Sequence, residues 1–160
     1  SPEEGELRSQ LQDRFGLSAD VRTPSDVPTR VEIIRSREAF DKDRGAFRKR
    51  WARKESTLRR RIQRAREALD SVDTPANLLE TAAKLCIALG TDGLRGELTL
   101  VRSARALAAL NSDSTATLEH LKTIAPSVLR HRLRRDPLDE SSADIRVERV
   151  IAELFNDCDD

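Results

Sequence analysis

The sequence has few aromatic residues and no long apolar run. Aromatic side chains make up 3% of the 160 residues, with Trp51 as the single Trp and no Tyr. Proteins that bind single-stranded nucleic acid without sequence preference commonly stack bases on several aromatic rings, so this class of function is disfavoured. No apolar run approaches the ~20 residues of a membrane-spanning helix, so we expect neither a membrane span nor a secretory signal peptide.

Cysteine is also scarce, and net charge is nearly absent. Cys86 and Cys158 lie far apart, outside any CxxC pattern, which predicts two free thiols in a reducing compartment. We expect Cys86 in the core and Cys158 in an acidic tail. Charged residues make up 36% of the chain, but the formal net charge is +1. This balance argues against a protein that binds polyanions through its global charge.

Several catalytic signatures are missing. The sequence has no glycine-rich loop ending in Lys-Ser/Thr, no HExxH and no GxSxG, so nothing indicates a self-contained catalyst. His120 and His131 have no acidic partners at metal-ligand spacing. We interpret both as surface or helix-cap residues, and we expect no metal site.

The abundant residues are helix formers. Ala, Leu, Arg and Glu dominate, while Gly and Pro number 6 each. The apolar spacing and turn residues predict a mainly α fold with helices over about 27–42, 44–70, 76–89, the turn at 90–96 to about 110, 118–134 and 143–156. Before them, a short helix over 7–15 stops at Gly16, and "LSADVRT", residues 17–23, alternates like a strand. A lone strand needs a sheet that this sequence does not contain.

The most basic stretch lies in the long predicted helix. From Arg44 to Arg66 there are eleven Lys and Arg residues and a single acid, Glu55. Leu58, Ile62, Ala65 and Leu69 recur at helical spacing and predict a narrow apolar seam. One interpretation is a solvated helix that buries this seam, and we favour it. The alternative is a surface for nucleic acid, acidic lipid or an acidic partner protein.

Two arginines lie at predicted helix ends. Arg95 falls in the first turn of the helix after Gly93, for which Asp92 is the predicted N-cap. An arginine beside exposed helix N–H groups makes a good anion site. Arg14 falls at the end of the first helix, where a cation suits the helix dipole. It could also reach the γ-phosphate of a nucleotide on a neighbouring protein. From the residues alone, solvent-exposed side chains explain both positions equally well or better.

Three segments, in order, resemble one family. "PEEGELRSQLQDRFGL", 2–17, is similar to the segment after sensor 1 in the ATPase (I) subunit of magnesium chelatase, an AAA+ protein. "LCIALGTDGLRGELTLVRSARALAAL", 85–110, looks like the sensor 2 region, and "LRHRLRRDPLDE", 129–140, looks like the C-terminal signature. The resemblance covers essentially the whole chain and is nearest to the enzymes of bacteriochlorophyll synthesis.

The resemblance implies a division of the chain. Residues 1–25 would be the C-terminal edge of an α/β AAA+ core, contributing its last helix and strand. Residues 26–75 would be a linker helix and a long basic helical insert, and residues 76–160 would be the helical lid with sensor 2. The P-loop and Walker B motif would belong to an N-terminal core that these residues do not include. Ser1 stands at the place of the family's sensor 1 asparagine.

The resemblance also implies site residues. Arg14 matches the arginine finger that acts across a subunit interface, and Asp13 matches its neighbour at that interface. Arg95 matches the sensor 2 arginine that touches nucleotide phosphates. The family's "LRPQLLDRFG" reads "LRSQLQDRFG" here, with Ser9 and Gln12 as the changes. Both changes leave Asp13 and Arg14 in place.

The implied function is that of a motor. Rings of this subunit, expected to be hexamers, bind and hydrolyse MgATP. With the D subunit and the porphyrin-binding H subunit they drive Mg²⁺ into protoporphyrin IX. ATP and Mg²⁺ would be bound mainly by the N-terminal core, so the isolated chain is expected to be inactive. The expected location is the bacterial cytoplasm rather than the chloroplast stroma. The alternatives are a non-enzymatic helical interaction module that binds through residues 44–66, and another AAA+ metal chelatase.

Overall fold

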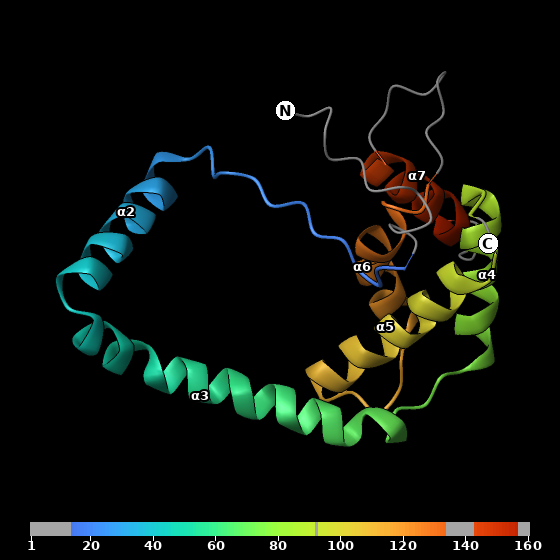
Figure 1. Ribbon diagram of the computed structural model, residues 1–160. Helices are drawn as coiled ribbons and strands as arrows, with labels where there is room; N and C mark the ends of the chain where they lie inside the picture. Colours follow the sequence, from blue (N-terminus) through green and yellow to red (C-terminus); the bar gives the residue numbers. More distant parts are fainter. Residues whose placement is uncertain (1–13, 92, 134–142, 157–160) are drawn as a thin grey trace. The chain divides into compact units, whose positions relative to one another are not determined.

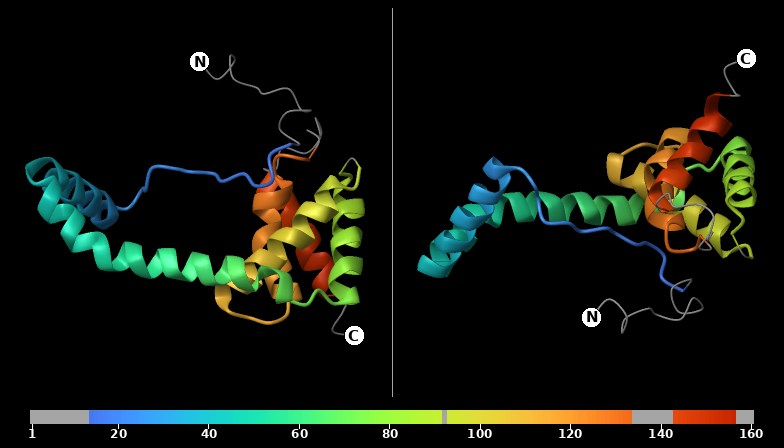
Figure 2. Two further views of the ribbon diagram at one scale, coloured as in Figure 1. Left: turned by 60° about the horizontal axis from the view of Figure 1, so that its bottom comes forward. Right: turned by 90° about the horizontal axis from the view of Figure 1, so that it is seen from above.

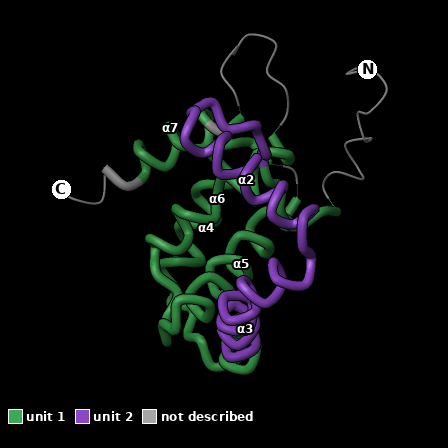
Figure 3. The backbone as a smooth tube through the Cα atoms, turned by 90° about the vertical axis from the view of Figure 1, so that its left-hand side faces the viewer, with its two compact units in different colours: residues 1–19, 65–160 green, residues 20–64 purple. Residues whose placement is uncertain are grey.

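The computed structural model describes residues 14–91, 93–133 and 143–156. Regular structure in these ranges is helical, and the described residues form no strand (Figure 1). The chain divides into two compact units, residues 20–64 and residues 1–19 with 65–160 (Figure 3). The elements are α2 (Val27–Lys42), α3 (Arg44–Ala68), the 3₁₀ turn η1 (Leu69–Ser71), α4 (Ala76–Leu89), α5 (Arg95–Asn111), α6 (Leu118–Leu129) and α7 (Ala143–Asn156).

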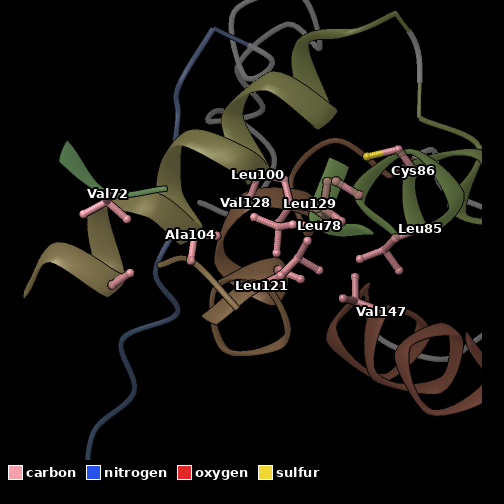
Figure 4. Packing of buried hydrophobic residues seen from close by; sticks show 14 of the residues in the cluster. Val72, Leu78, Leu85, Cys86, Leu100, Ala104, Leu121, Val128, Leu129 and Val147 are labelled. Carbon is pink, nitrogen blue, oxygen red and sulfur yellow. The ribbon is translucent and has the colours of Figure 1, made fainter. Parts of the chain in front are cut away.

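The core of the larger unit lies among α4, α5, α6 and α7. Helix α5 packs against α6, and α7 lies beside α4 and α6 (Figure 2). Apolar residues at helical spacing produce the buried faces, as the pattern predicts. In α5 the buried positions are mostly small, which lets its backbone approach its neighbours closely. Figure 4 shows large side chains from all four helices meeting in this core, among them Leu78, Leu85, Leu100, Leu121, Val128, Leu129 and Val147.

Two glycines shape the turn between α4 and α5. Gly90 ends α4 with φ of 66°, the left-handed region that glycine adopts most easily, and its N–H donates to Cys86 O and Ile87 O. Gly96 is buried in the first turn of α5. A Cβ there would lie 3.3 Å from Cys86 Sγ and 3.4 Å from Thr91 Oγ1, tighter than most contacts. Glycine therefore allows the start of α5 to lie directly on α4.

Most of the predicted helices are confirmed. α2, α4 and α7 have the predicted bounds, and the long basic helix continues into η1. α6 is shorter than predicted, because it ends at Leu129 and residues 130–133 form turns. The N-cap residue of α5 is Leu94, which makes no capping side-chain hydrogen bond, and the predicted cap Asp92 lies outside the described residues.

The predicted strand at 17–23 is wrong. These residues have no regular structure, and Ser18 N–H donates to Ser127 O at 2.8 Å instead of to a neighbouring strand. Alternation of apolar and polar residues favours a strand only where a partner strand can accept its hydrogen bonds. The short helix predicted over 7–15 falls almost entirely outside the described residues.

The unit of residues 20–64 has no buried core of its own. α2 begins with a Pro in its first turn and an Asp26 N-cap, whose carboxylate accepts the Thr29 N–H at 2.8 Å. The rings of Phe40 in α2 and Phe47 in α3 meet edge to face, with their centroids 5.5 Å apart. No residue of this unit is buried, although Phe40, Phe47 and Trp51 are partly covered.

The apolar seam of α3 is therefore only partly confirmed. Ala65 is buried and Leu69 packs against the core of the larger unit, as predicted. Leu58 and Ile62 remain 55% and 45% exposed. The spacing placed the four residues on one side of the helix, but spacing alone cannot supply a partner for the first two. None of the described helices is long and apolar enough to cross a membrane.

Leu100 and Leu98 provide a matched test of this core. Both lie on α5, but Leu100 is fully buried and Leu98 is 54% exposed. Leu100→Ala should lower the free energy of unfolding by about 2–5 kcal/mol, because it leaves a cavity. Leu98→Ala should change it by no more than about 0.5 kcal/mol. Chemical denaturation of both variants measures the difference, and equal losses would contradict the described packing of α5.

Cys86 should make stability depend on alkaline pH. Burial, followed by the nearby Glu97 carboxylate, raises the pKa of its thiol from 9.0 to about 11. An unfolded chain therefore releases this proton at lower pH than the folded chain does. Its stabilising contribution is complete below pH 9 and is lost as pH rises toward 11. Unfolding measured across this range should show a shallower decline for Cys86→Ala than for the parent chain, and equal slopes would count against this assignment.

Candidate functional site

Arg95 is the first residue of α5, where the sequence predicts an anion site. It is exposed, and the turn before it contains Gly93 with φ of 67°. The first N–H groups of a helix have no partners within the helix and carry partial positive charge. Leu94, the N-cap residue, makes no side-chain capping hydrogen bond. Arg95 thus brings a guanidinium next to a helix end that favours anions.

The side of α5 that carries Arg95 also meets the segment that follows Arg14. In a helix, residues four apart lie on the same side and residues two apart on roughly opposite sides. Thr99 therefore shares the side of Arg95, while Glu97 does not. A Cβ built on Gly16 would lie 3.9 Å from Thr99 Cγ2, which is ordinary contact. The chain two residues after Arg14 thus runs within one helical turn of Arg95.

Arg14 itself is exposed and lies at a turn, which opens the described part of the chain. Asp13, the predicted interface neighbour, lies outside the described residues. The two arginines come from segments separated by eighty residues, so only the fold brings their neighbourhoods together.

The segment after Arg14 is held by the end of α6. Arg132 Nη2 donates to Phe15 O at 2.8 Å, and its Nη1 donates to Gly16 O at 3.2 Å and to Val128 O. His131 Nε2 lies 2.9 Å from the same Phe15 oxygen. Neither contact could be predicted from the sequence, in which both residues fall within the segment that resembles the family's C-terminal signature.

His120 has a structural place instead of a catalytic one. It is 8% exposed, so the surface interpretation is wrong, whereas the helix-cap interpretation is confirmed. Thr117 N–H donates to His120 Nδ1 at 3.1 Å, which leaves Nε2 to carry the proton and donate to Asp113 Oδ2 at 3.0 Å. Within the described ranges, no group of three His, Cys, Asp or Glu side chains could hold a metal ion.

A groove of ≈ 520 Å³ is lined mainly by residues of α5. Its apolar lining comes from Leu79, Leu98 and Val101. Its polar lining comes from Glu97, Arg102 and Arg105 of α5 and from Thr74, which lies just before α4. Neither Arg14 nor Arg95 belongs to its lining.

Comparisons with known proteins agree with one another. The AAA lid domain profile matches residues 79–153. The magnesium-chelatase 38 kDa subunit of Acidiphilium rubrum is 57% identical over 98% of this chain and 45% of its own length. The corresponding subunit of Cereibacter sphaeroides is 55% identical over 97% of this chain and 46% of its own length. The chloroplastic magnesium-chelatase subunit ChlI of Oryza sativa is 43% identical over 97% of this chain and 37% of its own length.

A solved structure agrees with the fold. A candidate ATPase from Cytophaga hutchinsonii superposes with a TM-score of 0.68 over 95% of this chain and 51% of its own, at 17% identity. The chain spans slightly less than half the length of the bacterial relatives named above. At 55–57% identity over nearly all of its residues, and with the AAA lid domain matched over residues 79–153, the chain is similar to the magnesium-chelatase 38 kDa subunits over somewhat less than half of their length.

Proposed function

We propose that the chain acts as the lid-side part of the AAA+ motor subunit of magnesium chelatase. In this function, ATP hydrolysis drives Mg²⁺ insertion into protoporphyrin IX. The observation that carries the proposal is the 57% identity to a magnesium-chelatase subunit over nearly the whole chain. The lid domain match is consistent with a part that moves when nucleotide state changes.

Arg14 and Arg95 are the proposed catalytic and nucleotide-binding residues. Arg14 would stabilise the charge that develops on the γ-phosphoryl group of ATP bound to a neighbouring subunit. Arg95 would bind nucleotide phosphates from the lid, where it is assisted by the first N–H groups of α5. The exposed Arg95 in the first turn of α5 fits a phosphate group. The position of Gly16, where an added Cβ would lie 3.9 Å from Thr99 Cγ2, supports a common location for both arginines.

The rest of the proposed motor follows the family. Residues 1–25 would complete an AAA+ core, residues 26–75 would form the helical insert and residues 76–160 the lid. ATP and its Mg²⁺ would be held mainly by a core bearing a P-loop, so that the 160 residues alone do not turn over ATP. The proposed assembly is a homo-oligomeric ring, a hexamer, that works with the D and H subunits in the bacterial cytoplasm. Asp13 would lie beside Arg14 at the subunit interface.

A chimaera tests these roles. Residues 1–160 would be joined to the N-terminal nucleotide-binding part of the Acidiphilium rubrum subunit, and ATP turnover and ATP binding measured separately. Arg14→Ala should lower turnover by about 10³-fold or more and leave ATP binding unchanged, because a finger acts on the transition state. Arg95→Ala should impair the use of ATP, including its binding.

Arg102→Ala is the matched control for Arg95→Ala. It removes an exposed arginine from the same helix, about two turns after Arg95. Turnover should stay close to that of the parent chimaera. Full turnover in Arg14→Ala would refute the finger, and equal effects of Arg95→Ala and Arg102→Ala would refute a specific role for the first turn of α5.

A second candidate function is supported by the exposed part of α3. Leu58 and Ile62 are about half exposed and lie one turn apart, among cations that include Arg59, Arg60 and Arg61. A narrow apolar stripe with basic flanks fits an acidic amphipathic helix of a partner protein. Charge complementarity favours this partner, while the lack of interleaved aromatic rings disfavours single-stranded nucleic acid.

Trp51, the single Trp and a residue of α3, offers a direct readout of such binding. A Glu/Leu amphipathic helical peptide should change its fluorescence, with an affinity that falls as salt rises from about 50 to 200 mM. Leu58→Ala with Ile62→Ala should weaken binding about tenfold or more, because burying an apolar side chain contributes about 1.5–3 kcal/mol. Val31→Ala on α2, also exposed, is the control. Binding of duplex DNA in preference to the peptide would overturn the proposal.

A further inference from the structure

We infer that Arg132 is a positioning residue that holds residues 14–18, here called the Arg14 segment, against the lid. This inference rests on the proposed function of Arg14 as an arginine finger. The Arg132 guanidinium donates hydrogen bonds to three carbonyl oxygens. Two of them belong to Phe15 and Gly16, directly after Arg14, and the third belongs to Val128 in the last turn of α6.

The end of α6 explains why Arg132 is available for this contact. In a continuing α-helix, Arg132 N–H would donate to Val128 O, four residues earlier. The helix ends at Leu129, and Arg132 N–H donates to Leu129 O at 2.9 Å instead. Val128 O is therefore left without that partner and accepts the guanidinium. A cation is also favourable at the C-terminal end of a helix. One bond thus fixes the guanidinium to the lid.

The remaining donors of Arg132 reach a segment that lies 116 and 117 residues earlier in the chain. The planar guanidinium can donate in parallel to two acceptors, and this geometry suits successive carbonyl groups. Phe15 is 58% exposed, so apolar burial contributes little to holding this segment. The polar contacts of His131 with Phe15 O, and of Ser18 with Ser127 O, lie beside the Arg132 bonds and point to the same docking.

A simple helix-capping role does not account for these contacts. Arg130 shows what such a role looks like, because its Nε donates at 3.1 Å to Pro126 O, one turn earlier in its own helix. Capping by Arg132 would need Val128 O alone. The two further bonds, to Phe15 O and Gly16 O, hold the backbone directly after Arg14 and so fix the position of Arg14. Arg130 is therefore a matched control for Arg132.

Positioning matters for a finger because charge stabilisation depends steeply on geometry. A displacement of about 1 Å can lower a rate about 10²-fold without weakening substrate binding. Arg14 directly precedes the clamped residues, so release of Phe15 and Gly16 should displace it. Arg132 would thereby make the position of the finger depend on the position of the lid.

The test uses the same chimaera with Arg132→Ala, Arg132→Lys, Arg130→Ala and Arg14→Ala, and with the double variant Arg14→Ala/Arg132→Ala. Arg132→Ala should lower kcat for ATP by about 10²-fold with KM unchanged. Arg132→Lys should recover part of this loss, because a lysine keeps the charge but cannot bind both carbonyls as a fork. Arg130→Ala should behave like the parent. The double variant should be no slower than Arg14→Ala alone.

Hydrogen exchange in the 160-residue chain supplies a readout that does not need ATP. The Ser18 amide, which donates to Ser127 O, should exchange faster in Arg132→Ala than in Arg130→Ala, while the amides of α4 and α5 keep their protection. Unchanged Ser18 exchange, or a global loss of protection that Arg132→Lys shares, would overturn the inference.

The kinetic outcomes separate the two hypotheses. If Arg14→Ala loses turnover and Arg132→Ala does not, the inference fails and the finger stands. If Arg132→Ala slows the Arg14→Ala background as much as it slows the parent, Arg132 acts independently of Arg14, and the inference fails again. If Arg14→Ala retains full turnover, the proposed function fails whatever Arg132 does.

Discussion

The close approach of α5 to α4 and α6 at Gly96 is the constraint on which the arginine site depends. A Cβ at this position would crowd Cys86 Sγ and Thr91 Oγ1, so glycine lets the first turn of α5 lie this deep without moving its neighbours. Arg95 is the adjacent residue, and Thr99, which meets the Arg14 segment, lies one turn farther along the same helix. The packing of α5 against its neighbours therefore also fixes where Arg95, the residue directly before Gly96, is presented.

The site is also built from helix ends and turns. Arg95 begins a helix, Arg14 lies at a turn, and Arg132 lies just after the last residue of α6. At each of these places the backbone has donors or acceptors that a helix interior would satisfy itself. Such groups bind anions or hold other segments, and this lets a small helical unit present charged side chains without a cluster of catalytic residues.

The sequence predicted the helices well because their causes are local. Apolar spacing, Asp26 as an N-cap and Gly90 after α4 specify helix type and ends within a few residues. The strand at 17–23 and the buried seam at Leu58 and Ile62 were wrong for a shared reason. Both need a partner elsewhere in space, and a periodic pattern contains no information on whether that partner is present.

The candidate site divides in the same way. Arg95 at a helix start could be predicted from "TDGLRG", and the family resemblance singled out Arg14. Neither clue identified Arg132, whose partners lie more than a hundred residues earlier in the chain. Such a contact depends on where α6 ends, and the predicted end at residue 134 would have enclosed Arg132 within the helix. A five-residue error in a helix boundary thus conceals a tertiary contact.

The burial of Cys86 has a chemical consequence for the lid. Oxidants attack the thiolate form of cysteine, and a pKa of about 11 keeps that form near one part in 10⁴ at neutral pH. The sulfur also has no solvent-exposed surface through which peroxide could reach it. The side-chain atom nearest to the place that a Cβ on Gly96 would occupy is thus a sulfur that fills space as a soft apolar group and is protected from oxidation.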